Sequence, residues 1–469
     1  WSQVSGIFRA INVLYIIWGA LLFFRVTEAD GTLHATSSIL QRLTPSRELQ
    51  VLLLAWGFTG FLQGVGGFGV PVAVVAPILV TMGFLPLQAV VMASLGHAWA
   101  ISFGSLGASY EALISATGLS GNEIGPWMAI FLGLVCYMVG GAVLFISGGK
   151  SMLRQGIWKL LSMATVMSLV QYGASRIGLA NIAAMLGALA GIITGSAWAV
   201  SQLKAQKKAA LDPDQTAMNM TKNDWSQLIP YGILLVIIFA VNFILPLKSL
   251  LNLIQLQVTL PALELPNQLI VPTAKTKGIS IFGHAGALLI YAGLMSLFLA
   301  YIRGALADDS MKKIKQGVLR SGFKSSLGIL AMMAMATTMQ TAGMVSLLSS
   351  SMASISGLFY PLVSPFIGAL GAFMTGSNTN SNVLFGAFQQ AVAKSLDLHV
   401  PLILAIHNAG AAVGSVFAPA KIIVGCSTVG LEGQESEALR STTKYGLIII
   451  GVLALIGYVA AMYVRSLAR

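Results

Sequence analysis

The sequence predicts an all-α, polytopic membrane protein, and composition, long apolar segments and an internal repeat are the observations that predict it. Of the 469 residues, 56% are hydrophobic and 9% are charged, and the mean hydropathy is +0.82. Soluble globular domains carry far more charge. Helices are expected because a membrane barrel would alternate apolar and polar residues. Segments that reach the roughly 20 residues needed to cross a bilayer are 7–24, 126–147, 177–200, 228–247, 279–302, 317–340 and 443–464.

Basic side chains lie in short stretches between the apolar segments, so the net charge of +12 indicates membrane topology rather than nucleic-acid binding. Two predicted crossings, 228–247 and 279–302, lie between two basic stretches that are both expected on the cytoplasmic side. Residues 248–277, which connect the two crossings, are therefore expected outside. The residues that mark the cytoplasmic side are Lys204, Lys207, Lys208, Lys222, Arg303, Lys312, Lys313, Lys315 and Arg320.

The two cysteines, Cys136 and Cys426, lie in apolar surroundings and are expected to be buried thiols rather than a disulfide framework. The sequence opens on Trp1 without an initiator methionine, so we expect further residues upstream. Its first residues do not resemble a cleavable signal peptide.

An internal repeat is visible when the sequence is compared with itself. Residues 97–105 read HAWAISFGS and residues 407–415 read HNAGAAVGS, at an offset of 310. The flanking charges are reversed, because segment 25–48 holds three arginines while its equivalent, 337–360, has no Lys or Arg. Equivalent loops should then face opposite sides of the membrane. Inverted repeats of this kind are typical of secondary transporters, whose substrate sites lie at the repeat interface.

Each copy contains an apolar segment that is interrupted by glycine or polar residues, with arms too short to cross the bilayer alone. We interpret the interruptions GVGGFG and TGSNTNSN as tips of re-entrant hairpins, which must be buried in protein or line a wet cavity. Close helix packing is an alternative for the glycines, and an exposed loop is an alternative for SNTNSN. The first predicted inverted repeat covers 1–200, with a re-entrant hairpin at 52–80 and a broken helix at 86–107. A cytoplasmic loop and connecting transmembrane helices follow at 201–316. The second predicted inverted repeat covers 317–469, with a re-entrant hairpin at 361–388 and a broken helix at 400–418.

The hairpin tips predict a site for a small carboxylate anion. Opposed tips aim the N-termini of helices, with their free N–H groups, at a shared point. Glycines allow close approach of the backbone, and Ser, Thr and Asn side chains replace water around a hydroxylated molecule. The candidate substrate-binding residues are Gln63, Gly64, Gly66, Gly67, Gly69, Ser105, Thr375, Gly376, Ser377, Asn378, Thr379, Asn380, Ser381, Asn382 and Ser415.

Four titratable residues are candidates for coupling transport to protons: His97, His407, Glu111 and Lys421. The histidines recur in both copies, intramembrane ionisable groups are costly, and imidazole exchanges protons near neutral pH. A hydrogen-bonded structural histidine is the alternative, and it is the interpretation that we prefer for His284. Glu111 is equivalent to Lys421 at the offset of 310, and charges that reach the membrane interface remain the alternative for this pair.

Four motifs carry a resemblance to a known family: FLQGVGGFGVPVAVVAPILV, FGSLG at 103–107, TGSNTNSNVLFGAFQ at 375–389 and APAKIIVGCSTVGLEGQESE at 418–437. Together they resemble the lactate permease family, from about residue 10 to the C-terminus. The resemblance implies a multi-pass transporter of the cell membrane, without enzymatic activity or cofactor, that takes up L-lactate, D-lactate or glycolate with a proton. It also implies kinship with the ion transporter superfamily, in which a mobile transport domain moves against a scaffold in an elevator mechanism. A homodimer is one assembly compatible with it.

The sequence departs from the family pattern at both tips. Gln63 stands where the family usually has an acidic residue, Asn378 stands where TGSDT has Asp, and His97 and His407 stand where we expect Asn. Coupling to protons through the histidines is one hypothesis, and coordination of Na⁺ by backbone and side-chain oxygens is another. A membrane oxidoreductase with haem between the two histidines and an uncoupled channel are alternatives of other classes.

Overall fold

The computed structural model describes residues 2–32, 35, 46–67, 69–208, 229–260, 262–264, 270–271, 274–275, 278–431 and 433–467. The chain forms two compact units. Unit 1 contains residues 1–36 and 222–348, and unit 2 contains residues 37–221 and 349–469. Each predicted repeat therefore contributes residues to both units. The predicted cytoplasmic loop lies largely outside the described residues, which resume at 229.

Unit 1 is built around α1 (Ser2–Ala29), which packs against α13 (Ala285–Ile302) and α14 (Ser310–Thr341). Glycines allow the contact: a Cβ on Gly19 would lie 2.4 Å from the carbonyl oxygen of Gly286. The unit also contains α11 (Ile229–Phe243) and α12 (Leu245–Leu251).

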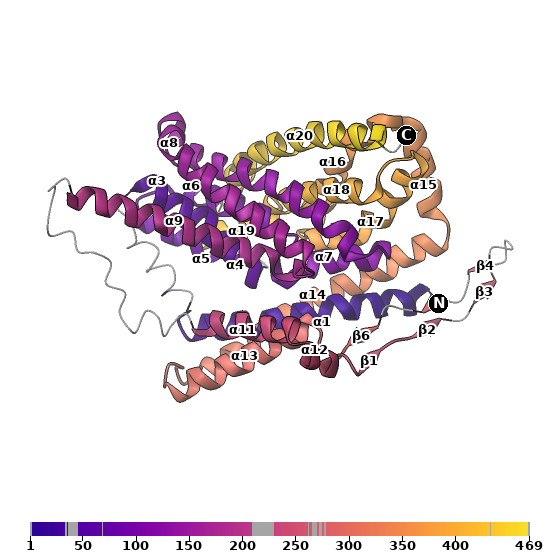
Figure 1. Cartoon of the computed structure of the whole chain (residues 1–469), viewed down its shortest axis with the longest axis horizontal. Coiled ribbons are helices and arrows are strands. Elements are labelled where there is room, and N and C mark those ends of the chain that lie inside the picture. The colour runs from indigo at the N-terminus through magenta and orange to yellow at the C-terminus, as the bar shows by residue number, and fades with distance from the viewer. Residues whose placement is uncertain are drawn as a thin grey trace. The chain divides into compact units, whose positions relative to one another are not determined.

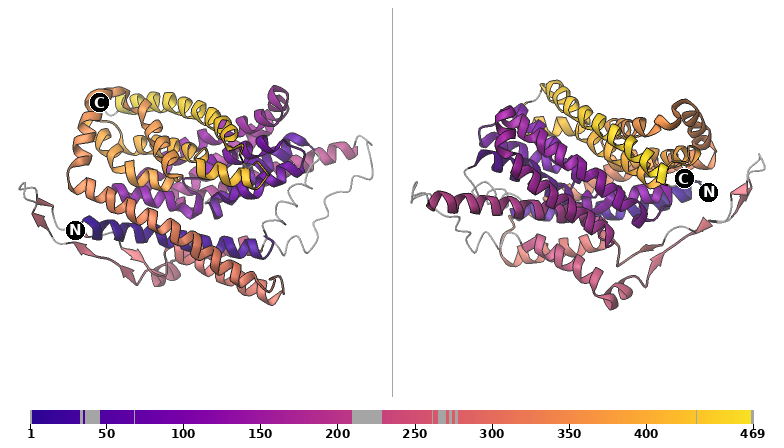
Figure 2. Two further views of the ribbon diagram at one scale, coloured as in Figure 1. Left: turned by 180° about the vertical axis from the view of Figure 1, so that it is seen from behind. Right: turned by 45° about the horizontal axis from the view of Figure 1, so that its top comes forward.

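The predicted external loop contains short antiparallel strand pairs, which the sequence analysis did not anticipate. The pairs are β1 (Gln255–Leu256) with β6 (Ile279–Ser280), β2 (Thr259–Leu260) with β5 (Ala274–Lys275), and β3 (Leu263–Glu264) with β4 (Ile270–Val271). They form a narrow ribbon that extends beyond the helices of unit 1 (Figures 1 and 2).

Two interrupted helical segments lie at the predicted hairpins, and apart from residues 344–348 they belong to unit 2. In the first, α3 (Arg47–Val51), the π-helix η1 (Leu52–Phe58) and α4 (Thr59–Val65) are followed after a break by α5 (Val70–Thr81). In the second, α15 (Met344–Ser356), η4 (Gly357–Phe359) and α16 (Tyr360–Thr375) are followed by α17 (Asn378–Ser395). Glycines with positive φ make both breaks: Gly67 (64°) and Gly69 (86°) in the first, and Gly376 (72°) in the second.

The helices that follow the two hairpins differ from each other. The helix α6 (Pro86–Gly96) is followed by η2 (Ala98–Ala100) and by α7 (Gly104–Thr117), with a 54° bend between the two parts. In the second copy α18 (Val400–Val416) is continuous, and the interruption comes at residues 417–418, before α19 (Pro419–Ser427). The predicted break within 400–418 therefore lies at the end of that range rather than in its middle.

The long helix α8 (Gly121–Arg176) is a hairpin of two antiparallel arms. The backbone leaves the helical region at Gly148 and Gly149. The arms meet where the Tyr137 hydroxyl and the Thr165 hydroxyl hydrogen-bond at 2.6 Å. Unit 2 is completed by η3 (Ala180–Ile182), α9 (Ala183–Lys208) and α20 (Glu435–Leu467).

Helices α16, α18 and α20 lie side by side (Figures 1 and 2). Small residues allow this packing, because a Cβ on Gly410 would lie 2.1 Å from the Pro365 carbonyl oxygen, and one on Gly414 would lie 2.4 Å from the Ala369 Cα. Among the described residues, seven helices are long and apolar enough to cross a membrane, or up to nine if each of two bent helix pairs is one span. The outer face of α20 carries exposed Leu447, Leu455 and Val459, which suits contact with lipid.

Candidate functional site

A buried cluster of amides and hydroxyls lies between α17, α18 and the segment before α7. The Asn378 Nδ2 donates to the Ser102 Oγ (3.0 Å) and the Asn408 Oδ1 (3.3 Å). The Asn382 Nδ2 donates to the Asn408 Oδ1 (2.9 Å) and to the Ser109 carbonyl (2.9 Å). The Asn408 Nδ2 donates to the Ser102 Oγ (2.7 Å). Predicted tip residues of the second copy are thus tied to the broken helix of the first.

The first tip contacts the same broken segment from another direction. The Ser105 Oγ donates to the Gly66 carbonyl (3.3 Å), and a Cβ on Gly67 would lie 2.0 Å from the Ser105 Oγ. The Gln63 side chain lies beside Gly104, and its Oε1 is buried without a hydrogen-bond partner in the described part of the chain. Residues 102–105 therefore touch both tips, the first through Ser105 and the second through Ser102. Gly64 packs against Met185 instead.

His97 lies at the C-terminal end of α6, where it is fully buried. Its Nδ1 lies 2.9 Å from the Ala93 carbonyl oxygen, one of the carbonyls at the end of α6. Its Nε2 is buried without a hydrogen-bond partner among the described residues.

His407 belongs to a different buried network, on the side of α18 that faces α16. Its Nδ1 lies 3.1 Å from the Gln389 Nε2. The Gln389 Oε1 accepts hydrogen bonds from the Tyr360 hydroxyl (2.6 Å) and the Ser364 Oγ (2.8 Å). The Gln389 Nε2 also donates to the Ser364 carbonyl (3.3 Å). The His407 Nε2 is buried, and no described residue meets hydrogen-bond geometry with it.

Lys421, in the first turn of α19, is a half-buried cation close to both the second tip and His97. Its Nζ donates to the Ser415 Oγ (3.1 Å), and its charge acts on the His97 ring. No carboxylate of the described residues forms an ion pair with it. The neighbouring Ala420 is exposed, and its Cβ lies beside Gly376. Glu111 is half-buried on α7.

The remaining residues of the second tip build the break itself. Ser377 caps α17 by accepting the Asn380 backbone N–H (3.4 Å), and the Thr375 Oγ1 lies 3.1 Å from the Ser377 carbonyl. The Ser381 Oγ donates to the Gly368 carbonyl (2.8 Å), so this predicted binding residue is occupied in helix packing. Thr379 is half-buried.

Sequence analysis missed several members of these networks: Ser102, Ser109, Asn408, Gln389 and Tyr360. Each is one of only a few polar residues in a largely apolar stretch, which is a weak signal alone. Asn408 directly follows His407 and Ser102 lies within the repeated HAWAISFGS segment, so their positions offered a signal that the sequence analysis did not use.

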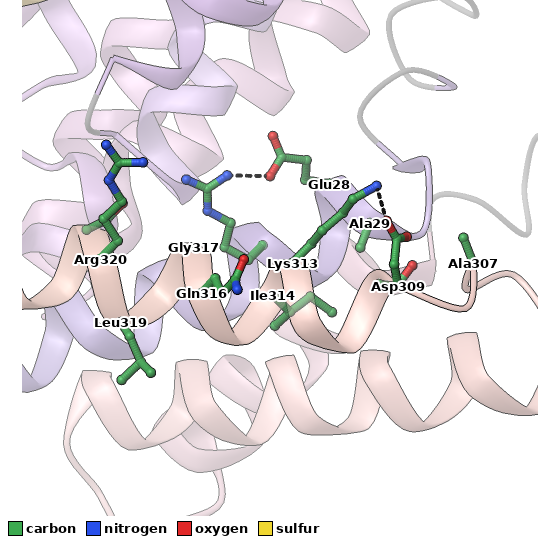
Figure 3. Close-up of a pocket in the computed structure, with 13 residues that line it drawn as sticks. Glu28, Ala29, Ala307, Asp309, Lys313, Ile314, Gln316, Gly317, Leu319 and Arg320 are labelled. Carbon is green, nitrogen blue, oxygen red and sulfur yellow. Dashed lines mark hydrogen bonds and ion pairs between the residues drawn. The ribbon is translucent and has the colours of Figure 1, made fainter.

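A cavity of about 940 Å³ lies apart from these residues, within unit 1, between α1 and α14. Two ion pairs lie among the residues that line it, Arg25 with Glu28 (2.7 Å) and Lys313 with Asp309 (2.7 Å). Figure 3 shows Lys313 projecting from α14 beside Glu28, with Arg320 farther along the same helix. None of the predicted site residues lines this cavity.

Comparison with known proteins gives matches over nearly the whole chain. The model of a family described as L-lactate permease matches residues 1–464. The L-lactate permease of Bacillus subtilis (strain 168) is 25% identical, with 97% of this chain and 85% of that protein covered. The L-lactate permease of Streptococcus iniae is 27% identical, with 82% and 79% covered. The glycolate permease GlcA of Escherichia coli (strain K12) is 26% identical, with 95% and 83% covered.

Among solved structures, the YdaH transporter of Alcanivorax borkumensis aligns with 97% of this chain and 86% of its own. The sequence identity is 12% and the TM-score is 0.48. This likeness is too weak to transfer topology or mechanism to the chain.

Proposed function

The chain belongs to the L-lactate permease family, and from this premise we propose that it is a symporter that carries a small 2-hydroxy monocarboxylate together with a proton. Membership makes the chain a multi-pass membrane transporter and not an enzyme. Lactate and glycolate are the substrates printed in the names of its relatives, and we propose the same substrate class here.

Lys421 is the observation that supports an anionic substrate best. A cation held among buried helices is costly unless a counter-charge is present. No carboxylate of the described residues supplies one, and the exposed neighbour Ala420 leaves the start of α19 accessible. A substrate carboxylate bound there would be the missing partner, and the Asn and Ser side chains of the tip would accept and donate hydrogen bonds to its 2-hydroxyl group.

The electrostatic interaction between Lys421 and His97 supports coupling to a proton. When no anion is bound, the positive charges of Lys421 and of a protonated His97 would repel each other. A bound carboxylate would neutralise the lysine charge, so anion and proton would each favour binding of the other. Such reciprocal coupling is what a symporter requires.

The packing of unit 2 supports an inverted duplication. The second arm of the second hairpin, α17, packs against α7 of the first copy, and the second arm of the first hairpin, α5, packs against α19 of the second copy. Glycines with positive φ follow α1 and α14, the equivalent first helices of the two copies: Gly31 (81°) and Gly343 (75°), 312 residues apart. We propose that unit 2 is the transport domain and unit 1 the scaffold of an elevator-type carrier.

Coupling to Na⁺ is the second candidate. Three buried oxygens that find no hydrogen-bond partner within the described ranges favour it, because hard cations prefer oxygen ligands: Gln63 Oε1, Asn378 Oδ1 and Asn382 Oδ1. The haem-binding oxidoreductase finds no support, because the family consists of permeases. An uncoupled channel would not accumulate substrate.

The test is uptake of labelled lactate and glycolate into proteoliposomes under an imposed proton gradient, with an imposed Na⁺ gradient as the second arm. We expect an inward proton gradient to drive accumulation and the Na⁺ gradient to leave uptake unchanged. Lys421→Met should weaken substrate affinity about 10- to 100-fold, the effect of losing a charge-assisted hydrogen bond.

The matched control is Lys394→Met, an exposed lysine at the end of α17, which should transport normally. Accumulation driven by Na⁺ alone would exclude proton coupling. Unchanged affinity in Lys421→Met would exclude the assigned anion site.

A further inference from the structure

We infer that the two repeat-related histidines are held in opposite tautomers, so that His97 offers a bare Nε2 that accepts a proton whereas His407 offers an Nε2–H that donates a hydrogen bond. The inference deepens the proposed proton symport and rests on it for its functional consequence. The tautomers themselves follow from hydrogen-bond partners alone. The two rings occupy equivalent places in the repeat but have different neighbours.

The neighbour of His97 fixes its tautomer directly. The atom 2.9 Å from its Nδ1 is the Ala93 carbonyl oxygen, which can only accept. The Nδ1 must therefore carry the hydrogen. In the neutral ring the Nε2 is then an acceptor, and it is buried without a partner among the described residues. An added proton would enter at Nε2 and leave the bond to Ala93 intact.

His407 is fixed through Gln389. The Ser364 carbonyl lies 3.3 Å from one terminal atom of the Gln389 amide, and a carbonyl requires a donor, so that atom is the Nε2. The Tyr360 and Ser364 hydroxyls meet the other atom, Oε1, as donors. The Gln389 Nε2 therefore also donates to the His407 Nδ1, which must be bare. The hydrogen of the neutral ring is then on Nε2.

The two rings consequently respond differently to a proton. Protonation of His407 at Nδ1 would bring its N–H against the N–H of Gln389 Nε2, and two donors cannot form a hydrogen bond. Rotation of the Gln389 amide by 180° would remove that conflict but would place the amide oxygen against the Ser364 carbonyl oxygen. His97 meets no such obstacle, and among the described residues Lys421 is the charged group that acts on it. No charged group of the described residues acts on His407, whose nearest titratable neighbour in its network is the Tyr360 hydroxyl, reached through Gln389. His97 is therefore assigned as the proton carrier and Gln389 as a positioning residue for His407.

The direct test is ¹⁵N NMR of the full-length chain with ¹⁵N-labelled histidine, in detergent micelles or nanodiscs at a pH where both rings are neutral. Signals are assigned with the His97→Gln and His407→Gln variants. We expect His97 to show a protonated Nδ1 and His407 a protonated Nε2. The same tautomer at both positions would overturn the inference. This measurement does not depend on any transport activity.

A positioning role for Gln389 has its own readout. Gln389→Leu should release the His407 tautomer into a mixture while the His97 signals stay unchanged. An unchanged His407 spectrum in a folded Gln389→Leu protein would show that another group sets the tautomer.

Transport then separates the functional roles. His97→Gln should reduce accumulation driven by a proton gradient at least tenfold, because glutamine carries no proton. Substrate counterflow should persist, because glutamine keeps a hydrogen-bond acceptor. His407→Gln keeps an N–H donor near the Nε2 position, so uptake should be weaker but still driven by the proton gradient. Loss of the drive in His407→Gln with retention in His97→Gln would reverse the assignment. Absence of wild-type uptake with the expected NMR tautomers would reject the proposed function and leave the tautomers standing.

Discussion

Asn408 is the residue that joins the buried amide cluster, and its removal tests how strongly the cluster holds unit 2. It makes hydrogen bonds with Asn378, Asn382 and Ser102. Asn408→Ala should lower the free energy of unfolding by about 2–4 kcal/mol, because three buried hydrogen bonds of roughly 1 kcal/mol each are lost. Thermal unfolding in detergent measures the effect. Ser395→Ala, at an exposed position of α17, is the control and should be neutral.

The free energy of unfolding should depend on pH through His399. It lies just before α18 and caps it, since its Nδ1 accepts the Leu402 backbone N–H (3.3 Å). Burial lowers the pKa of His399 below its ordinary value of 6.5. The unfolded chain therefore binds the proton more readily, and stability is fully present above about pH 6.5 and falls as the pH drops below that value toward the folded-state pKa.

The substitution His399→Asn separates capping from titration. Asparagine is a good N-cap and carries no proton. The wild-type midpoint of thermal unfolding should therefore fall more between pH 7 and pH 5 than that of His399→Asn, by an amount equivalent to about 1 kcal/mol. Equal acid sensitivity of the two proteins would contradict a role for this cap.

Sequence alone located two of the five members of the amide cluster. The polar run SNTNSN inside an apolar segment pointed to Asn378 and Asn382, because polar groups at that depth need partners. Their partners Ser102 and Ser109 come from the other copy, 276 and 273 residues away. No periodicity along one chain reports such a pairing. The assignment of Ser381 to substrate binding likewise could not foresee its bond to the Gly368 carbonyl.

At the scale of elements, the start of α7 is the most strained backbone of unit 2. Ser105, Leu106 and Gly107 have φ values of 47°, 51° and 80°, and the first two residues carry side chains that disfavour this left-handed region. The strain aims Ser105 at Gly66 and seats Gly107 against Asn181. Strained backbone of this kind persists only where the surrounding packing enforces it.

A pair of glycine variants in α7 separates strain from packing. Gly107 and Gly118 both have positive φ, 80° and 72°, but a Cβ on Gly107 would lie 2.8 Å from the Asn181 Cα, whereas nothing lies within 4 Å of one on Gly118. Gly118→Ala should cost about 1 kcal/mol from the left-handed conformation alone. Gly107→Ala should cost about 2–4 kcal/mol, because overpacking adds to it. Thermal unfolding of both variants is the measurement, and equal costs would contradict the close contact.

Hydropathy predicted the long helices well because length and apolar composition are properties of one segment. Each predicted apolar segment overlaps a helix of the structure, and those at 7–24, 317–340 and 443–464 lie wholly within α1, α14 and α20. Elements decided by contacts were not predicted. The π-helix η1 is buried along its whole length. The strand pairs of residues 255–280 depend on hydrogen bonds between residues that are distant in the sequence. The bend before α7 agrees with the broken helix predicted at 86–107, whereas α18 runs without interruption through most of the second predicted broken helix, 400–418.

At the scale of the whole molecule, packing and sequence order divide the chain differently. The predicted repeats run consecutively along the chain, whereas each compact unit takes residues from both. One helix of each predicted repeat, α1 and α14, packs in unit 1, while the segments of both predicted hairpins pack in unit 2. Sequence comparison detects the duplication through residues such as His97 and His407. It carries no information about which helices of each copy pack together.

The duplication makes a prediction about membrane sides that labelling can test. Asn122, just after α7, and Thr428, at the end of α19, are exposed and lie in equivalent stretches of the two copies. The stretch 108–125 has no Lys or Arg, whereas 418–442 holds Lys421 and Arg440. By the distribution of positive charge, Asn122→Cys should react with an impermeant thiol reagent from outside and Thr428→Cys from the cytoplasmic side.

The experiment compares right-side-out and inside-out vesicles. Background should be low because both native cysteines are buried. Reaction of the two variants from the same side would mean that the copies are parallel, and the two hairpin tips would then enter the bilayer from one face. Reaction from opposite sides is the result expected if the two hairpins enter the bilayer from opposite faces, as the proposed anion site beside residues 102–105 requires.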